Sequence, residues 1–267
     1  FPTRRSSDLI DLSVGSLVAL STVVATLLLQ NIFNNSSNPM LIGLSFLGGV
    51  LMCGLLGMVS GFLSTILKIP AFIATLAMML IARGWALNLA DNQTIKVGLP
   101  DIGWLGQNPN PIILMLVLYV LAYLIMHKTV LGRQIYAIGG NPEAARLSGV
   151  PVYKTLMIVY MISGLMAGIA GIVMASELNS GSGEFGEMWE LNVIAAVVVG
   201  GTSLMGGQGK ILGTLIGCVI IEVINNGMNL MAIGSNTQKI VLGLVILMAI
   251  VIDKVKKGEL VLMRSTK

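Results

Sequence analysis

Charged residues are scarce in this sequence. Asp, Glu, Lys and Arg make up 10% of the 267 residues, whereas soluble domains carry about 25%. The sequence has one histidine, His127, and two cysteines, Cys53 and Cys218, which lie within apolar runs. These residues fit no metal-ligand spacing, so we expect no metal site and interpret the cysteines as small packing residues. The net charge of +4 comes mostly from loops and does not indicate nucleic-acid binding.

Signatures of catalysis are also missing. The string GGQGK at 206–210 resembles part of a phosphate-binding loop, but that pattern needs glycine where Leu204 stands and Ser or Thr where Ile211 stands. The sequence contains no Ser/His/Asp set and no paired carboxylates in a plausible cleft. We therefore expect a protein that is not an enzyme and holds no cofactor. Any work driven by ATP would have to come from an ATPase on another polypeptide.

Long apolar runs are abundant instead. Hydrophobic residues make up 55% of the chain and the mean hydropathy is +0.89, more apolar surface than a soluble core of this size can hide. The runs are continuous rather than alternating, which favours helices over a barrel. We predict an all-α integral membrane protein with about eight transmembrane helices. Their rough spans are 12–30, 40–67, 70–88, 110–127, 152–176, 191–205, 211–232 and 238–253.

The sixth of these segments is short and rich in glycine, which allows a broken or re-entrant helix. Other glycines lie inside apolar runs at small-xxx-small spacing, and we interpret them chiefly as tight packing within one subunit. Subunit contact or helix sliding is the alternative. The three clearest pairs are Gly57 with Gly61, Gly164 with Gly168, and Gly213 with Gly217.

The loop charges predict an orientation. When the first nine residues and the intramembrane Arg83 are set aside, eleven Lys and Arg residues fall on one side of an eight-crossing arrangement. Only Lys96 and Lys239 fall on the other. Because positive loops stay inside, the first side is predicted to be cytoplasmic, with both ends of the chain on it. The acidic 177–190 loop is then predicted to lie outside.

The first nine residues, FPTRRSSDL, fit nothing that follows and match the translation of a common sequencing-adaptor sequence. We therefore expect residues 1–9 to be non-native and the natural chain to begin upstream. Residues 10–255 are predicted to form the transmembrane domain, with a polar loop at 128–151, and 256–267 a cytoplasmic tail.

The polar loop holds the densest basic cluster of the interior, including Arg133, and contains a short predicted helix. Asn141 is a good N-cap and Pro142 suits the first helical position. Glu143 lies in the first turn, where a carboxylate meets the helix dipole favourably. Gly149 suits the C-terminal end. Such a helix is well placed to meet a partner protein at the cytoplasmic face.

Ionisable residues within apolar segments are costly and often functional. Arg83 lies near the outer end of the third segment, where it either snorkels to the interface or contributes to a pathway. Glu222 lies mid-segment and shares one helix face with Asn225, Asn226 and Asn229. That face serves either interhelical hydrogen bonding or a pathway for a polar solute.

Several strings, in order, resemble one family. EAARLSG at 143–149 resembles the coupling motif of ABC importer permeases, and the wider GRQIYAIGGNPEAARLSGV resembles the ribose, xylose and galactose permeases. Further resemblances cover most of residues 10–255. They are IDLSVGSLVAL, PAFIATLAMMLIARG, SGLMAGIAG, ELNVIAAVVVGGTSLMGGQGKILGTLIG and NNGMNL.

The resemblance implies a permease subunit of an importer that moves a monosaccharide across the bacterial inner membrane by alternating access. It implies about ten helices in the full-length protein, a second permease subunit, a solute-binding protein, and an ATPase that binds ATP and Mg²⁺. The ATPase would dock on the short helix. The residues implied in coupling are Arg133, Asn141, Glu143, Ala144, Ala145, Arg146 and Gly149. Those of a possible pathway are Arg83, Glu222, Asn225, Asn226 and Asn229.

Two alternatives remain open at this point. The first keeps the importer class but changes the solute to a branched-chain amino acid or a nucleoside. The second is an ion-coupled secondary transporter, which would favour paired intramembrane carboxylates and matching broken helices in two halves.

Overall fold

The computed structural model describes residues 10–98, 100–203 and 206–256. Residues 1–9 and most of the predicted tail, 257–267, lie outside the described residues. The chain divides into a first unit that ends at Glu190 and a second unit that begins at Leu191. The helices are α1 (Val14–Leu27), α2 (Pro39–Thr65), α3 (Ala71–Leu89), α4 (Asn110–Lys128), α5 (Val130–Gly140), α6 (Pro142–Leu147), α7 (Val152–Leu178), α8 (Trp189–Val199), α9 (Ile211–Leu230) and α10 (Ser235–Lys256).

The all-α membrane architecture is confirmed. Among the described residues, six helices are long and apolar enough to cross a membrane, and the first of these spans combines α1 with the π-helical turn η2 (Leu28–Ile32). Two further apolar helices, α8 and the Ser235–Val251 part of α10, are shorter. Together they lie where the eight apolar segments are predicted. The sixth predicted segment, 191–205, corresponds to α8, whose 11 residues extend about 16 Å at 1.5 Å per residue, too short for a bilayer core of about 30 Å.

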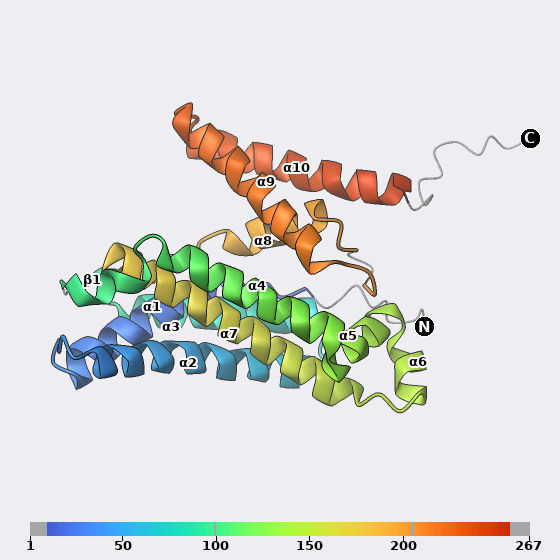
Figure 1. Cartoon of the computed structure of the whole chain (residues 1–267), viewed down its shortest axis with the longest axis horizontal. Coiled ribbons are helices and arrows are strands. Elements are labelled where there is room, and N and C mark those ends of the chain that lie inside the picture. The colour runs from blue at the N-terminus through green and yellow to red at the C-terminus, as the bar shows by residue number, and fades with distance from the viewer. Residues whose placement is uncertain (1–9, 99, 204–205, 257–267) are drawn as a thin grey trace, which may run out of the picture. The chain divides into compact units, whose positions relative to one another are not determined.

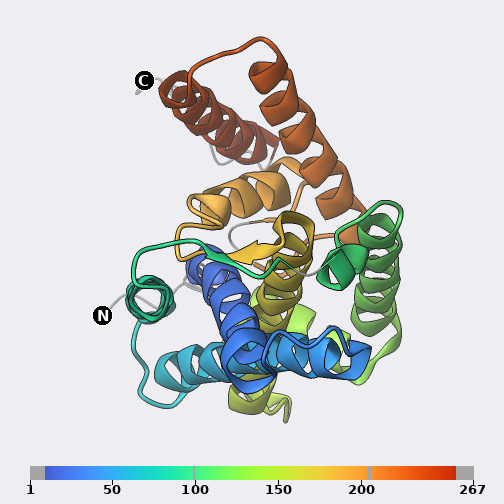
Figure 2. The ribbon, with the colours of Figure 1, turned by 90° about the vertical axis from the view of Figure 1, so that its left-hand side faces the viewer.

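Helix α1 is the centre of the first unit. Eleven of its 14 residues are buried, and α2, α3 and α7 pack around it (Figures 1 and 2). Its buried side chains include four hydroxyls, those of Ser16, Ser21, Thr22 and Thr26. Such small and hydroxyl-bearing residues are typical of helix interfaces inside membranes.

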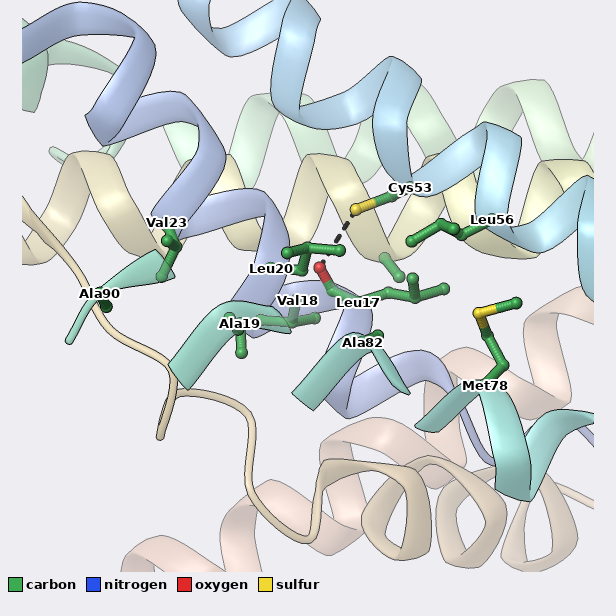
Figure 3. Packing of buried hydrophobic residues seen from close by; sticks show 12 residues of the cluster. Leu17, Val18, Ala19, Leu20, Val23, Cys53, Leu56, Met78, Ala82 and Ala90 are labelled. Atoms are coloured by element: carbon green, nitrogen blue, oxygen red, sulfur yellow. Dashed lines mark hydrogen bonds between the residues drawn. The ribbon is translucent and has the colours of Figure 1, made fainter. Parts of the chain in front are cut away.

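The apolar core lies against α1. Leu17 and Leu20 meet Leu56 of α2 and Met78 of α3 within one buried cluster, which Figure 3 shows. In the same cluster the thiol of Cys53 donates to the Leu17 carbonyl oxygen over 3.2 Å. Cys53 is fully buried, which confirms that it is a packing residue.

Helices α2 and α7 touch backbone to backbone. A Cβ atom added to Gly57 would meet the carbonyl oxygen of Tyr160, and one added to Gly164 would meet that of Cys53. In the second unit, Gly213 and Gly217 of α9 likewise pack against the Gly200 and Ala196 carbonyls. The predicted tight packing of these glycine pairs within one subunit is confirmed.

Two short strands close one end of the first unit, the end opposite α5 and α6. Strand β1 (Ile95–Lys96) pairs antiparallel with β2 (Ser180–Gly181), with Ile95 opposite Gly181. Figure 2 shows β2 as an arrow beside α1. The pairing joins the connection after α3 to the connection after α7, which are about 85 residues apart in sequence.

The second unit contains the greater part of α8 together with α9 and α10. Ala195 and Ala196 pack with Ile221 in a small buried cluster. The turn between α9 and α10 is held by Gln238, whose amide donates to Asn229 Oδ1 and to the Ile233 carbonyl, each over 2.8 Å.

Candidate functional site

Helices α5 and α6 form a helical hairpin, the α5–α6 hairpin, which follows α4 at one end of the first unit. The Thr129 side chain caps α5 by accepting from the Gly132 amide over 3.3 Å. A Cβ on Gly132 would collide with the Ile125 and Met126 carbonyls, so the glycine lets α5 fold back tightly on α4. The far side of the hairpin is tied down by Thr155 of α7, whose hydroxyl lies 3.1 Å from Gln134 Oε1.

Helix α6 has both ends satisfied, as predicted. Asn141 Oδ1 accepts from the amides of Glu143 and Ala144 over 3.1 and 3.0 Å, and Pro142 occupies the first turn. At the other end the Gly149 and Val150 amides donate back to the carbonyls of Arg146 and Ala145. Gly149 has φ +83°, which completes a Schellman-type end that favours glycine. Helix α6 has only six residues, so its two capped ends, rather than its length, define it.

The exposed face of α6 carries a bidentate ion pair. Arg146 Nη2 lies 2.6 Å from Glu143 Oε1, and Nε lies 3.2 Å from Oε2. The hydrogen bond and charge of Arg146 lower the pKa of Glu143, and Glu143 in turn raises the pKa of Arg146. Both side chains are more than half exposed, so the pair contributes little to stability. It presents a fixed pattern of charge to whatever binds there.

The two alanines of α6 point in different directions. Ala144 is exposed, whereas Ala145 is only 5% exposed and α6 packs against α5 and α7. Of the two alanines implied in coupling, Ala144 is accessible to a partner, whereas Ala145 anchors the helix to the first unit; their role in coupling stays a prediction. Arg133 on α5 is exposed and belongs to the same hairpin.

Arg83 contacts the backbone of another segment. Its Nη1 donates to the carbonyl oxygens of Gly183 and Phe185 over 2.6 and 2.7 Å. The side chain is half-buried and does not simply snorkel away from the protein. The sequence suggested no partner for it, because the two carbonyls lie 100 and 102 residues further along the chain.

The polar stripe of α9 lies in the second unit, remote in sequence from the hairpin. Glu222, Asn226 and Asn229 are exposed and Asn225 is partly buried. Asn229 accepts a hydrogen bond from Gln238 of α10, which is one interhelical contact of the stripe. For the other three residues the choice between packing and pathway stays a prediction.

The loop charges predict only an outer loop for residues 180–190 and do not indicate that this segment packs against the helices. The structure shows that the segment runs back along α1. Gly181 packs on Thr22 and Thr26, while Gly186 packs on the Gly15 carbonyl and Val18. The SGSGEFG string, with glycine at nearly every second position, was the available signal, because it allows close backbone approach.

Comparison with known proteins gives a consistent result. The family described as branched-chain amino acid transport system / permease component matches residues 5–250. The ribose import permease protein RbsC of Escherichia coli (strain K12) is 41% identical over 257 residues, covering 93% of this chain and 78% of that protein. RbsC of Bacillus subtilis (strain 168) is also 41% identical, over 93% of this chain and 77% of its own. The L-arabinose transport system permease protein AraH of E. coli (strain K12) is 40% identical, over 92% of this chain and 75% of its own. No solved structure gives a significant match.

Proposed function

This chain belongs to the branched-chain amino acid transport system / permease component family, and on that premise we propose that it is the membrane subunit of an ATP-driven monosaccharide importer. The observation that carries the proposal is the 40–41% identity, over more than nine-tenths of the chain, to permeases named for ribose and arabinose. Those names favour a sugar over a branched-chain amino acid or a nucleoside. They also favour a transport subunit over an enzyme. The resemblance of residues 143–149 to the coupling motif favours an ATP-driven importer over an ion-coupled transporter.

The α5–α6 hairpin is the proposed docking surface for the ATPase. It offers the exposed Glu143–Arg146 pair, the exposed Ala144 and, on α5, Arg133. Asn141 and Gly149 fix the two ends of α6, and Ala145 fixes its packing on the first unit. Because α6 is attached at both ends and along one side, a displacement of its exposed face is transmitted to α5 and α7.

The orientation of the hairpin follows the distribution of positive loops, which places it in the cytosol. In this arrangement the ATPase binds ATP and Mg²⁺ on the cytosolic side of the bacterial inner membrane. A solute-binding protein delivers the sugar on the opposite side, where β1 and β2 lie. A second permease subunit completes the path. ATP-driven closure of the ATPases then moves the hairpins and switches access from one side to the other.

The test is uptake by the complete importer with substitutions in α6. Glu143→Gln removes the charge of the ion pair and is expected to lower ATP-driven sugar uptake and the amount of ATPase that co-purifies with the permease. Glu177→Gln is the matched control, because Glu177 is an exposed carboxylate at the other end of α7. It should leave both measurements unchanged. Normal uptake and normal co-purification for Glu143→Gln would contradict the docking role.

A further inference from the structure

The segment 180–190 is non-helical up to Met188 and is held against α1 and α3. Besides the β1–β2 pairing, the Ser182 amide donates to the Thr22 hydroxyl over 3.2 Å. Gly183 lies against the backbone of Leu87, where a Cβ would come within 2.8 Å of the Leu87 nitrogen. Gly186 reaches the Gly15 carbonyl. The segment thus follows α1 from near its last turn to near its first.

These contacts show how deeply the segment penetrates. The first span runs from Val14 to Ile32, so Gly15 lies about 25 Å along the axis from the Ile32 end. A bilayer core is about 30 Å thick, so the segment between Gly181, which lies on Thr26 and Thr22, and Gly186, which lies on Gly15, runs inside the core. Non-helical backbone at that depth occurs only where it is buried in protein or lines a water-filled cavity.

One side of the 180–190 segment is buried in protein. Ser180, Ser182 and Gly186 are buried against the first unit. Arg83 completes this attachment, since its guanidinium donates to the Gly183 and Phe185 carbonyls.

The other side carries carboxylates. Glu184 and Glu187 are both exposed, and a charged side chain that faces lipid at this depth is strongly disfavoured. The exposed side therefore faces water or protein rather than lipid. In a transport subunit, a water-exposed surface inside the bilayer core lies on the solute path.

We propose that Arg83 is a positioning residue for transport, which holds the 180–190 segment so that the side bearing Glu184 and Glu187 lines the aqueous solute path. This inference rests on the proposed function. It changes the role predicted for Arg83, because the arginine acts through the segment rather than by touching the solute.

Thiol labelling tests whether the segment meets water. Glu184→Cys and Glu187→Cys are made singly in a Cys218→Ser background, where Cys53 stays because it is fully buried. A charged, membrane-impermeant thiol reagent should modify both at least about tenfold faster than Leu116→Cys, since only a hydrated thiol ionises readily. Leu116 is the matched control because it is 50% exposed on α4, a helix with no buried residues. Rates as slow as that of Leu116→Cys would overturn the proposal.

Uptake kinetics of the complete importer test Arg83 itself. Arg83→Ala should lower the maximal uptake rate about tenfold, because hydrogen bonds to a charged donor are lost. The half-saturating sugar concentration should change less than about twofold, since only a step after capture is affected. Arg83→Lys, which still donates, should restore part of the rate, and Asn88→Ala, an exposed site on the same helix, should have none of these effects.

The outcomes separate the two proposals. A wild-type maximal rate for Arg83→Ala overturns the positioning role; if that variant fails to accumulate, a wild-type rate for Arg83→Met, which keeps a long side chain but cannot donate, overturns it equally. A parent protein that shows no ATP-driven sugar uptake would instead overturn the proposed function. The labelling pattern does not depend on that uptake and would still decide whether the segment meets water.

Discussion

The α2–α7 interface and helix α6 belong to the same unit but have opposite surroundings. At the interface, backbones meet through Gly57 and Gly164 and leave no room for a side chain. On α6 most side chains are exposed, and the defining interaction is an ion pair in solvent. Close packing is sensitive to every added carbon, whereas exposed ion pairs contribute little to stability. We therefore expect substitutions at the interface to change folding and substitutions on α6 to change transport.

Enlarging a glycine at the interface should have the largest effect. Gly57→Leu forces a side chain against the Tyr160 carbonyl and the Gly164 backbone, so we expect a loss of about 3 kcal/mol in the free energy of unfolding. Gly43→Leu is the control in the same helix, because a Cβ there meets nothing within 4 Å. Unfolding in detergent measures both. Equal stability of the two variants would show that the α2–α7 contact is looser than described.

Thr155 of α7 lies where that helix meets the α5–α6 hairpin. It is 1% exposed, and its hydroxyl lies 3.1 Å from both Gln134 Oε1 and the Pro151 carbonyl. Thr155→Val keeps the shape and should cost about 1 kcal/mol in unfolding free energy, with a detectable decrease in uptake because α5 loses a tie to α7. The same assays report both quantities. An unchanged stability would mean that packing alone holds the hairpin.

The cap of α6 should affect the helix more than the whole protein. Asn141→Ala removes the acceptor for the Glu143 and Ala144 amides and should destabilise α6 by about 1 kcal/mol. Faster hydrogen exchange at those amides and lower ATP-driven uptake are expected. Asn141→Asp should preserve both, since aspartate caps equally well. Unchanged exchange in the alanine variant would contradict the assigned cap.

The exposed ion pair should have the smallest effect on stability. Arg146 lowers the pKa of Glu143, so the pairing is complete above the ordinary carboxyl pKa and is lost as the pH falls through the lowered value. Arg146→Ala should raise the Glu143 pKa towards its ordinary range without changing the melting temperature. Carboxyl-carbon NMR titration in lipid nanodiscs measures the pKa. A Glu143 pKa that does not move would show that the pair is absent in solution.

The same contrast explains what could be predicted from sequence. The ends of α6 depend on neighbours within four residues, so Asn141, Pro142 and Gly149 sufficed to place them. Glycine spacing predicted close packing of the helices that carry Gly57 and Gly164, because it marks one helix face, but it did not predict that these two helices meet each other. The Arg83 contacts with Gly183 and Phe185 span about 100 residues, and no local pattern encodes them.

Hydropathy did not predict which helices are buried inside the protein. The span that contains α1 has a mean hydropathy of 1.6 and α4 has 2.0, yet 67% of the residues in the first are buried and none in the second is. In a bilayer both lipid and protein interior are apolar, so hydrophobicity predicts that a helix crosses but not what it faces. The hydroxyls of α1 were the better indicator of a central position.

The most direct test of the central claim is the dependence of sugar uptake on ATP. The permease, together with its ATPase and solute-binding protein, is reconstituted into liposomes, and uptake of labelled ribose or arabinose is measured with ATP, without ATP, and for the permease alone. We predict uptake only with ATP and all partners present, and a loss of that uptake in Glu143→Gln. Uptake of the same sugar by the permease alone in ATP-free vesicles would contradict the assignment.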